Sequence, residues 1–247
     1  LSSERRSELR EAPRYGIMLL ESYSDNEAEI DNFIYGLRGE FIEQGDGGDI
    51  IRSPEILPTG RNLTQFDPTR IPTENAFKRG EEIARNTLSE HLERNGCHPE
   101  SIGTVLWGFE TTKTGGETVG QILSYLGVRI ERSRGTWSPK LSVVPLDVLG
   151  RPRIDCLVNI CGFFRDMFPN LLELLDQAFD LVAGLDEPLE LNYIRKHSME
   201  NLEHLKDKGL DPKTTRKMAN GRIFGPQAGE YGTRILPLIE DSIWKTE

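Results

Sequence analysis

The chain has 247 residues, of which 36% are hydrophobic and 28% charged, and its formal net charge is -10. This length suffices for one large domain or two small ones, and apolar residues spread along the whole chain argue against intrinsic disorder. The acidic balance argues against a dedicated nucleic-acid binder, because attraction to phosphates needs a positive surface. No apolar run approaches the roughly 18 residues that span a bilayer, so we expect no integral membrane segment. The first residues, Leu1–Arg6, are mostly polar, so we expect no signal peptide.

Three cysteines, Cys97, Cys156 and Cys161, form an odd set without a C-x-x-C pair. Reduced thiols are the simplest account of them, and we therefore expect a cytoplasmic protein. The histidines show no spacing typical of a metal site, since even His197, on a predicted helix, has no second histidine four residues away. We expect no metal site in this chain.

The first part of the chain shows one strand pattern and two helix patterns. The apolar run Tyr15–Leu20 predicts a buried strand, and Ser24–Glu27 has the spacing of a capping box before a helix. The apolar face of that helix carries Ile30, Phe33, Ile34, Leu37 and Phe41. Residues 57–73 hold three prolines and a glycine and predict a long irregular loop. Thr73 then predicts the N-cap of a helix that ends at Asn95–Gly96.

The remainder alternates between strand and helix patterns. Strands are predicted at 103–109, 128–131, 141–146 and 154–160, and helices at 119–126, 169–184, from Pro188, from Asp211–Pro212 and at 235–244. Strands separated by helices predict an α/β fold with a mostly parallel sheet, helices on both faces and Rossmann-like layering. We expect one α/β domain over residues 1–247, with a sub-boundary near 96–100 between an N-terminal part, 1–95, and a main sheet part, 96–247.

The predicted loop Thr111–Gly116 joins a strand to a helix, so its backbone N–H groups would face a ligand at the carboxyl end of the sheet. Gly115 and Gly116 permit close backbone approach, and Lys113 adds a positive charge. The residue order differs from that of a nucleotide P-loop, which argues against ATP at this place. A tight turn whose glycines serve packing explains the same residues, and both alternatives stay open.

Two other segments combine charged and aromatic residues. In Gly162–Phe168, the neighbours Arg165 and Asp166 would hold a ligand or else pair and cap the helix. In Arg222–Gly232, glycine and proline among charged and aromatic residues indicate a loop whose backbone path matters. No order of Ser, His and Asp, or of Cys and His, suggests nucleophilic catalysis.

Nine short motifs follow one another from about residue 50 to the end of the chain. They are Pro58-Thr-Gly-Arg-Asn62, Asp67-Pro68, Ile71-Pro72-Thr73, Val105-Leu-Trp-Gly108, Lys113-Thr-Gly-Gly-Glu117, Gly150-Arg-Pro-Arg-Ile-Asp155, Gly162-Phe-Phe-Arg-Asp166, Arg195-Lys-His197 and Arg222-Ile-Phe-Gly225. Together and in this order they resemble the large subunits of ATP-dependent tetrapyrrole metal chelatases. That family has a cobalt branch and a magnesium branch, and Gly225–Gly232 is more similar to the cobalt branch.

The resemblance implies an internal part of the large subunit of a cobaltochelatase, which inserts Co2+ into a corrin precursor in cobalamin biosynthesis. The alternative is the same part of a magnesium chelatase, which acts with Mg2+ on protoporphyrin. ATP would be hydrolysed on AAA+ ATPase and adaptor subunits, the metal ion would be a substrate, and this chain would bind neither tightly. The family's T-H-G-x-L-E motif does not occur here, so we expect no activity from the chain alone.

A tetrapyrrole needs aromatic walls and a few convergent polar groups. The expected walls are Trp107, Phe163 and Phe164, and the expected donors are Arg61, Lys113, Arg165 and the amides of Gly115 and Gly116. Glu117 and His197 are the candidates for accepting the pyrrole protons. Two other functions remain open: a non-catalytic scaffold that docks the ATPase subunits, and a binder of sugar or nucleotide phosphates.

Overall fold

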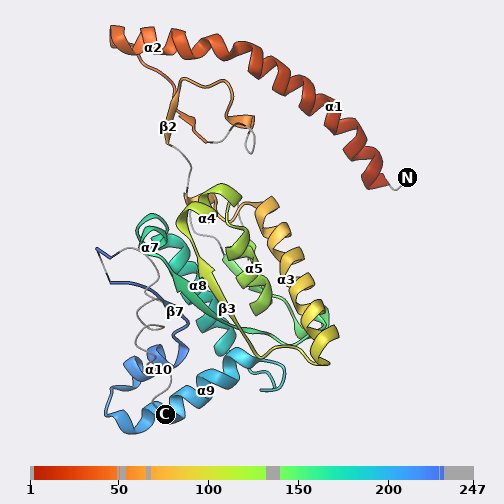
Figure 1. Ribbon diagram of the computed structural model, residues 1–247, viewed down its shortest axis with the longest axis vertical. Coiled ribbons are helices and arrows are strands. Elements are labelled where there is room, and N and C mark those ends of the chain that lie inside the picture. Colours follow the sequence, from red (N-terminus) through yellow and green to blue (C-terminus); the bar gives the residue numbers. More distant parts are fainter. Residues whose placement is uncertain are drawn as a thin grey trace. The chain divides into compact units, whose positions relative to one another are not determined.

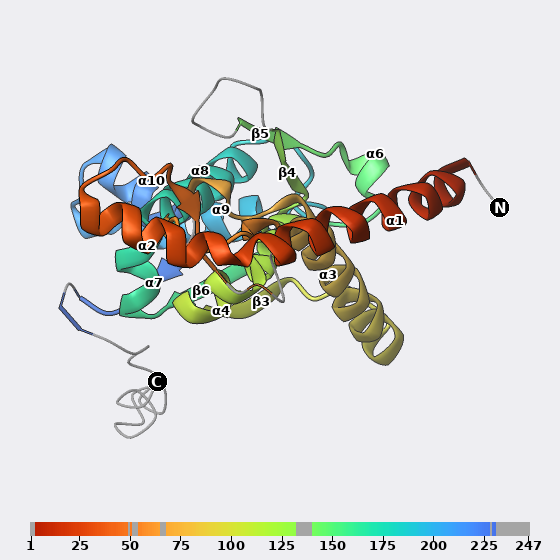
Figure 2. The ribbon, with the colours of Figure 1, turned by 90° about the horizontal axis from the view of Figure 1, so that it is seen from above.

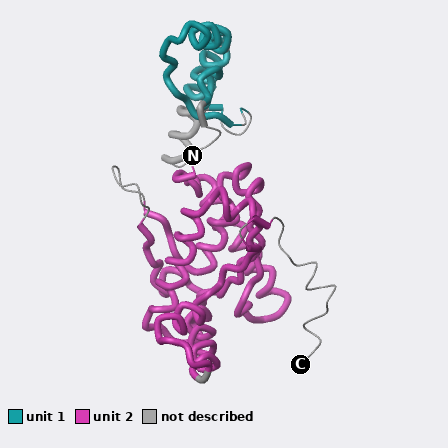
Figure 3. Tube along the Cα trace, turned by 90° about the vertical axis from the view of Figure 1, so that its left-hand side faces the viewer, with its two compact units in different colours: residues 1–67 teal, residues 68–247 magenta. Residues whose placement is uncertain are grey.

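The computed structural model describes residues 3–48, 50, 54–64, 68–131, 140–227 and 229–230. The chain forms two compact units, Leu1–Asp67 and Pro68–Glu247 (Figure 3). The division thus lies at Asp67–Pro68 and not near residues 96–100, where we expected a sub-boundary. The helix Glu74–Asn95 (α3) belongs to the second unit because it packs on the helix Glu117–Leu126 (α5).

The first unit is mainly helical. Its elements are α1 (Ser3–Ser24), η1 (Asp25–Glu27), α2 (Ala28–Arg38), β1 (Gly45–Asp46), η2 (Pro54–Ile56) and β2 (Asn62–Thr64), with β1 and β2 parallel. The strand predicted at Tyr15–Leu20 is wrong, because these residues continue α1 and Leu20 is 70% exposed. A short apolar run does not by itself distinguish a strand from a helix, and here strong helix formers such as Glu and Arg flank it.

The helix predicted after the capping-box residues Ser24–Glu27 is confirmed as α2. It ends before Gly39, so Phe41 lies beyond it. The long connection from Leu57 to Thr73 is largely irregular as predicted, and the regular elements among its described residues are the three-residue strand β2 and the short 3-10 helix η3 (Pro68–Arg70). Thr73 caps α3 as predicted, since its Oγ1 accepts a hydrogen bond from the amide of Ala76 at 3.2 Å.

Three parallel strands form the centre of the second unit (Figure 1). They are β3 (Ser101–Leu106), β6 (Asp155–Ile160) and β7 (Ile223–Phe224), in the order β3–β6–β7. A separate antiparallel pair, β4 (Val128–Glu131) and β5 (Lys140–Val143), lies apart from this sheet (Figure 2). The other helices are α4 (Gly108–Thr114), α6 (Leu146–Leu149), α7 (Gly162–Met167), α8 (Pro169–Ala183), α9 (Tyr193–Leu205), η4 (Lys206–Lys208) and α10 (Pro212–Asn220). The α/β fold with a mostly parallel sheet is confirmed.

Successive side chains of β6 point to opposite sides of the sheet. On one side Cys156, Val158 and Ile160 are buried, and α5 contacts both β3 and β6. On the other side Asp155 lies under α9, whereas Leu157 is 48% exposed. Both sides therefore carry helices, but the second side is covered at its amino end and exposed further along the strand.

Three local predictions differ from the structure or lie outside it. The loop predicted from Thr111 to Gly116 is largely helical, because α4 begins at Gly108. The helix predicted from Pro188 begins only at Tyr193, where the side chain of Asn192 accepts a hydrogen bond from Arg195 N. The helix predicted at 235–244 falls outside the described residues.

Candidate functional site

The carboxyl ends of β3 and β6 lie side by side and each continues into a short helix. Trp107 is still extended, and α4 starts at Gly108; Cys161 is extended, and α7 starts at Gly162. The amide of Phe164 donates a hydrogen bond to Cys161 Sγ at 3.4 Å, which fixes the start of α7. Figure 1 shows α4 and α7 together at this end of the sheet, and α9 and α10 at the opposite end.

Three aromatic residues lie at this carboxyl end, and we call Trp107, Phe109 and Phe163 the aromatic edge. The rings of Phe109 and Phe163 are stacked, with centroids 4.5 Å apart and planes 15° apart. Phe109 is 68% exposed and Trp107 50% exposed, and Phe163 is half-buried. Phe164, in contrast, is fully buried and packs on Phe168 at 5.2 Å, so it belongs to the core and cannot face a ligand.

The two glycines that follow α4 are explained by packing. Gly116 has φ +91°, and a side-chain carbon there would lie 2.6 Å from Ile71 Cγ2. The carbonyl of Gly115 accepts a hydrogen bond from the amide of Thr73 at 2.9 Å, and the amide of Gly116 donates to Thr114 Oγ1 at 3.3 Å. The tight-turn explanation therefore accounts for the Gly116 amide, and an anion at this loop stays a prediction.

Lys113 and Glu117, two of the expected site residues, have different surroundings. Lys113 is exposed on α4. Glu117 forms an ion pair with Arg79 of α3 across 2.8 Å, which directs its carboxylate towards that helix. We did not predict Glu110, whose Oε1 accepts hydrogen bonds from Thr114 at 3.0 Å and Thr118 at 3.1 Å. The threonines spaced four and eight residues after Glu110 were the signal in the sequence.

Arg165 holds the chain that follows β7. Its Nη1 donates to the carbonyl of Pro226 at 2.9 Å and to that of Gln227, and its Nε donates to Asp166 Oδ1 at 2.8 Å. The guanidinium is thus engaged with the backbone, so the structure places Arg165 as a support for the segment 226–227. Arg61, another expected donor, lies in the first unit, where its side chain packs against Gly45.

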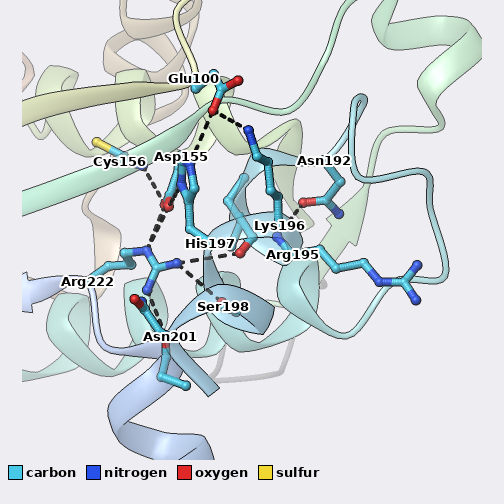
Figure 4. Close-up of polar contacts among 12 residues, drawn as sticks. Glu100, Asp155, Cys156, Asn192, Arg195, Lys196, His197, Ser198, Asn201 and Arg222 are labelled. Atoms are coloured by element: carbon cyan, nitrogen blue, oxygen red, sulfur yellow. Dashed lines mark hydrogen bonds and ion pairs between the residues drawn. The ribbon is translucent and has the colours of Figure 1, made fainter. Parts of the chain in front are cut away.

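A second polar cluster lies at the amino end of β6 (Figure 4). Both oxygens of the buried Asp155 carboxylate accept hydrogen bonds from Arg222 Nε, at 2.8 and 2.9 Å. His197 Nδ1 lies 2.8 Å from Asp155 Oδ2, and its Nε2 lies 3.5 Å from Glu100 Oε2. Glu100 also accepts a hydrogen bond from Lys196 Nζ at 2.6 Å. We call Glu100, Asp155, Lys196, His197 and Arg222 the Asp155 cluster.

The Asp155 cluster joins three of the motifs that were noted in the sequence, and its arginine is structural. Arg222 is 2% exposed and donates further hydrogen bonds to the carbonyl of Ala219 at 2.9 Å and to Ser198 Oγ at 3.2 Å. The pKa of Glu100 is lowered, chiefly by the hydrogen bond from Lys196, and the pKa of Lys196 is raised, chiefly by the same bond. Both groups are solvent-exposed enough that this pair contributes little to stability.

His197 is far from the aromatic edge. Five residue steps of β6 separate Asp155 from Ile160, which corresponds to roughly 16 Å along a strand. His197, a candidate for accepting the pyrrole protons, therefore does not lie with the aromatic residues expected to form the walls of the same pocket, because α9 packs at the opposite end of the sheet. The spacing of the motifs in the sequence did not show this separation. The motif that ends at Asp155 and the motif that begins at Gly162 are close in sequence, but the strand β6 lies between them and places them at opposite ends of the sheet.

The arginines of the segment 150–155 also have structural partners. Arg153 is fully buried, and its guanidinium bonds Glu187 twice at 2.8 Å and three backbone carbonyls. Burial, followed by the charge of Arg153, lowers the pKa of Arg151 to about 10. Arg151 donates to the carbonyls of Tyr125 and Ser124. These residues tie β6 to α5 and do not face a ligand.

The sequence and fold have known relatives. The family described as CobN/Magnesium Chelatase matches residues 4–247. The chain belongs to this family. A magnesium-chelatase subunit from Chlorobaculum parvum is 39% identical over 94% of this chain, and the aerobic cobaltochelatase subunit CobN from Pseudomonas aeruginosa is 37% identical over 89%.

A solved structure shows the same fold in this CobN/magnesium chelatase family. The catalytic subunit of cobaltochelatase from Mycobacterium tuberculosis matches with a TM-score of 0.68 and 37% identity, and the match covers 87% of this chain and 18% of that one. The match likewise covers 18% of each of the two curated relatives, so the chain spans about a fifth of their length. None of the described helices is long and apolar enough to cross a membrane.

Proposed function

We propose that the chain is part of the large, tetrapyrrole-binding subunit of a cobaltochelatase, and that the aromatic edge contacts one face of the macrocycle. The observation that supports this is the stacked pair of Phe109 and Phe163 at the carboxyl end of a parallel sheet, where the exposed Trp107 directly precedes α4. Ligands of open α/β sheets bind at this end. An exposed aromatic surface of this kind matches the flat apolar face of a tetrapyrrole.

The polar groups around the aromatic edge would meet the rim of the macrocycle. Lys113 is exposed on α4 and would attract peripheral carboxylates. Arg165 would act indirectly, because it holds the segment 226–227 in place. Glu117 remains the proton acceptor that we propose at the carboxyl end of the sheet. His197 lies at the amino end, so it would not accept a proton from a macrocycle bound at the aromatic edge. The metal ion is a substrate in this proposal, and ATP is hydrolysed on AAA+ ATPase subunits that act as partners.

The choice of metal rests on one segment. Magnesium and cobalt relatives are similar to this chain at 39% and 37% identity, so overall similarity does not separate them. Gly225–Gly232 is more similar to the cobalt branch, and we therefore propose Co2+ and a corrin precursor. Mg2+ and protoporphyrin are the alternative. Comparing the affinity of the large subunit for a corrin and for a porphyrin distinguishes the two.

The role of the aromatic edge is tested by a titration of the large subunit that contains this chain. A tetrapyrrole is added, and the shift of its absorbance band gives the affinity. Phe109→Ala is compared with Phe33→Ala, because both phenylalanines are 68% exposed and only Phe109 lies on the aromatic edge. We expect Phe109→Ala to weaken binding by about tenfold, as the loss of one aromatic contact implies, and Phe33→Ala to leave it unchanged. Equal affinities would refute the site, and no band shift with the unaltered subunit would favour the scaffold function.

A further inference from the structure

The second side of the sheet carries an apolar surface that the described residues leave exposed. Val105, Leu157 and Phe224 are 37%, 48% and 57% exposed. The register places them on the same side of adjacent strands, because Val105 pairs with Asn159, and Asn159 pairs with Phe224. We call these three residues the open sheet face.

The open sheet face has a hollow at Gly103 that side chains of another segment could fill. Gly103 lies opposite Leu157 in the register, and a side-chain carbon on Gly103 would meet no heavy atom within 4 Å. The surface is therefore hollow beside Leu157. At the amino end of the same side, Asp155 is 2% exposed because α9 and Arg222 cover it, so the cover ends part-way along β6.

An exposed apolar face is unusual for strands of this type. Parallel strands occur almost only in sheets that are covered on both faces, since their side chains are apolar on both. Contiguous apolar patches on a protein surface mark places where another protein surface packs. Asn159 lies between Val105 and Phe224 on this side and is polar but uncharged, and the one ionisable side chain of β6 on this side, Asp155, is buried. A surface without an exposed charge on β6 fits permanent packing better than a partner that is steered by charge and then released.

We infer that the open sheet face is covered by another segment of the same large subunit, outside residues 1–247. The length of the relatives supports this occupant, because the chain matches about a fifth of each, so about four fifths of such a subunit lies elsewhere in its sequence. This inference depends on membership of the family and not on the tetrapyrrole site that we propose above.

Cysteine labelling of the full-length large subunit tests the inference. Leu157→Cys reports on the open sheet face, and Val148→Cys, at a position that is 70% exposed on α6, is the matched control. Both are made in a Cys97→Ser background, because Cys97 is the exposed native thiol among the three cysteines. Cys156 and Cys161 are buried, and burial raises the pKa of Cys156 to about 12, so neither adds a fast signal.

A photoreactive phenylalanine analogue at position 224 provides a second measurement that does not depend on the folding of the Leu157→Cys variant. The cross-linked peptides are identified by mass spectrometry, and their mobility shows whether one or two chains are joined. In the cysteine experiment, the labelling rate of each folded variant is divided by the rate of the same variant unfolded in urea, which removes differences in intrinsic thiol reactivity.

If the inference is correct, Leu157→Cys reacts at least about tenfold more slowly than Val148→Cys, because the reagent reaches position 157 only when the covering segment detaches transiently. The analogue at position 224 then cross-links to peptides outside residues 1–247 of the same polypeptide. Equal labelling rates would overturn the inference. Cross-links confined to residues 1–247, to a second copy of the chain or to an ATPase subunit would also overturn it, as would slow labelling without any cross-link outside this chain segment.

Discussion

The ring of Phe163 occupies the space that a side chain at Gly108 would need. A side-chain carbon on Gly108 would lie 2.0 Å from Phe163 Cδ1, which is far inside van der Waals contact. Gly108 begins α4 and Phe163 lies in the first turn of α7, so this contact brings together the two helices that follow the neighbouring strands β3 and β6. The missing side chain at Gly108 is what permits Phe163 to stack on Phe109.

Gly108→Ala should therefore displace Phe163 and disrupt the stacked pair. We expect a loss of about 1–3 kcal/mol in the free energy of unfolding, the usual cost of overpacking, together with weaker tetrapyrrole binding. Gly16→Ala, on α1 of the first unit, is the control, because a side-chain carbon there meets nothing within 4 Å. Urea unfolding of both variants provides the measurement. Equal stabilities would show that α4 and α7 move apart without cost.

Gly116→Ala tests whether the glycines after α4 serve packing. An alanine there would have φ +91° and would lie 2.6 Å from Ile71 Cγ2. Gly150→Ala is the control, since Gly150 has φ +68° but open space around it. We expect about 1 kcal/mol of destabilisation at Gly150 from the left-handed backbone alone, and a further 1–3 kcal/mol at Gly116 from the clash. If thermal unfolding shows no difference between them, packing does not explain Gly116, and anion binding becomes the better account.

The elements predicted correctly were those with strong local signals. Thr73 and Asp211 cap their helices with side-chain oxygens, as their residue types predict. The helix α5 and the strand β6 have clear apolar patterns, and most of the apolar residues of both elements are buried. These signals are local in sequence, so they do not depend on where the element packs.

The errors concern information that a single sequence does not hold. The run Tyr15–Leu20 is apolar enough for a strand, but no neighbouring strand pairs with it and it continues α1. His197 and Phe163 belong to two of the motifs that carry the family resemblance, yet they lie at opposite ends of the sheet. Phe109 was assigned to a strand, and only the contact with Phe163 shows that it belongs to the aromatic edge. Each of these depends on tertiary packing.

Arg165→Ala should loosen the segment that follows β7. The change removes the hydrogen bonds to the carbonyls of Pro226 and Gln227. The amide of Glu230 donates a hydrogen bond to the carbonyl of Gln227 at 3.0 Å. Losing one charge-assisted bond costs roughly 1.5–3 kcal/mol, so exchange of the Glu230 amide should rise by about one to two powers of ten. Asp166→Asn is the control, because it weakens the ion pair with Arg165 and leaves both carbonyl contacts. Unchanged exchange in Arg165→Ala would mean that other contacts hold this segment.

Asp155→Asn should destabilise the fold more than a change at any exposed charged residue. It removes the charge that neutralises Arg222, whose side chain is 2% exposed, and leaves that guanidinium buried without a counter-charge. Breaking a buried ion pair from one side costs about 3–5 kcal/mol.

Glu100→Gln is the matched control, because it removes a carboxylate of the same cluster whose side chain is 49% exposed. We expect it to cost about 0–1 kcal/mol, as for other exposed pairs. Its pH dependence has a defined sign: the pKa of Glu100 is lowered by Lys196, so the small contribution of this pair is present above the ordinary value of 4.5 and disappears as the pH falls. Chemical unfolding of both variants at pH 7 measures the difference. If Asp155→Asn were no more destabilising than Glu100→Gln, hydrogen bonds to carbonyls and Ser198 would suffice to hold Arg222, and the charge of Asp155 would be available for another role.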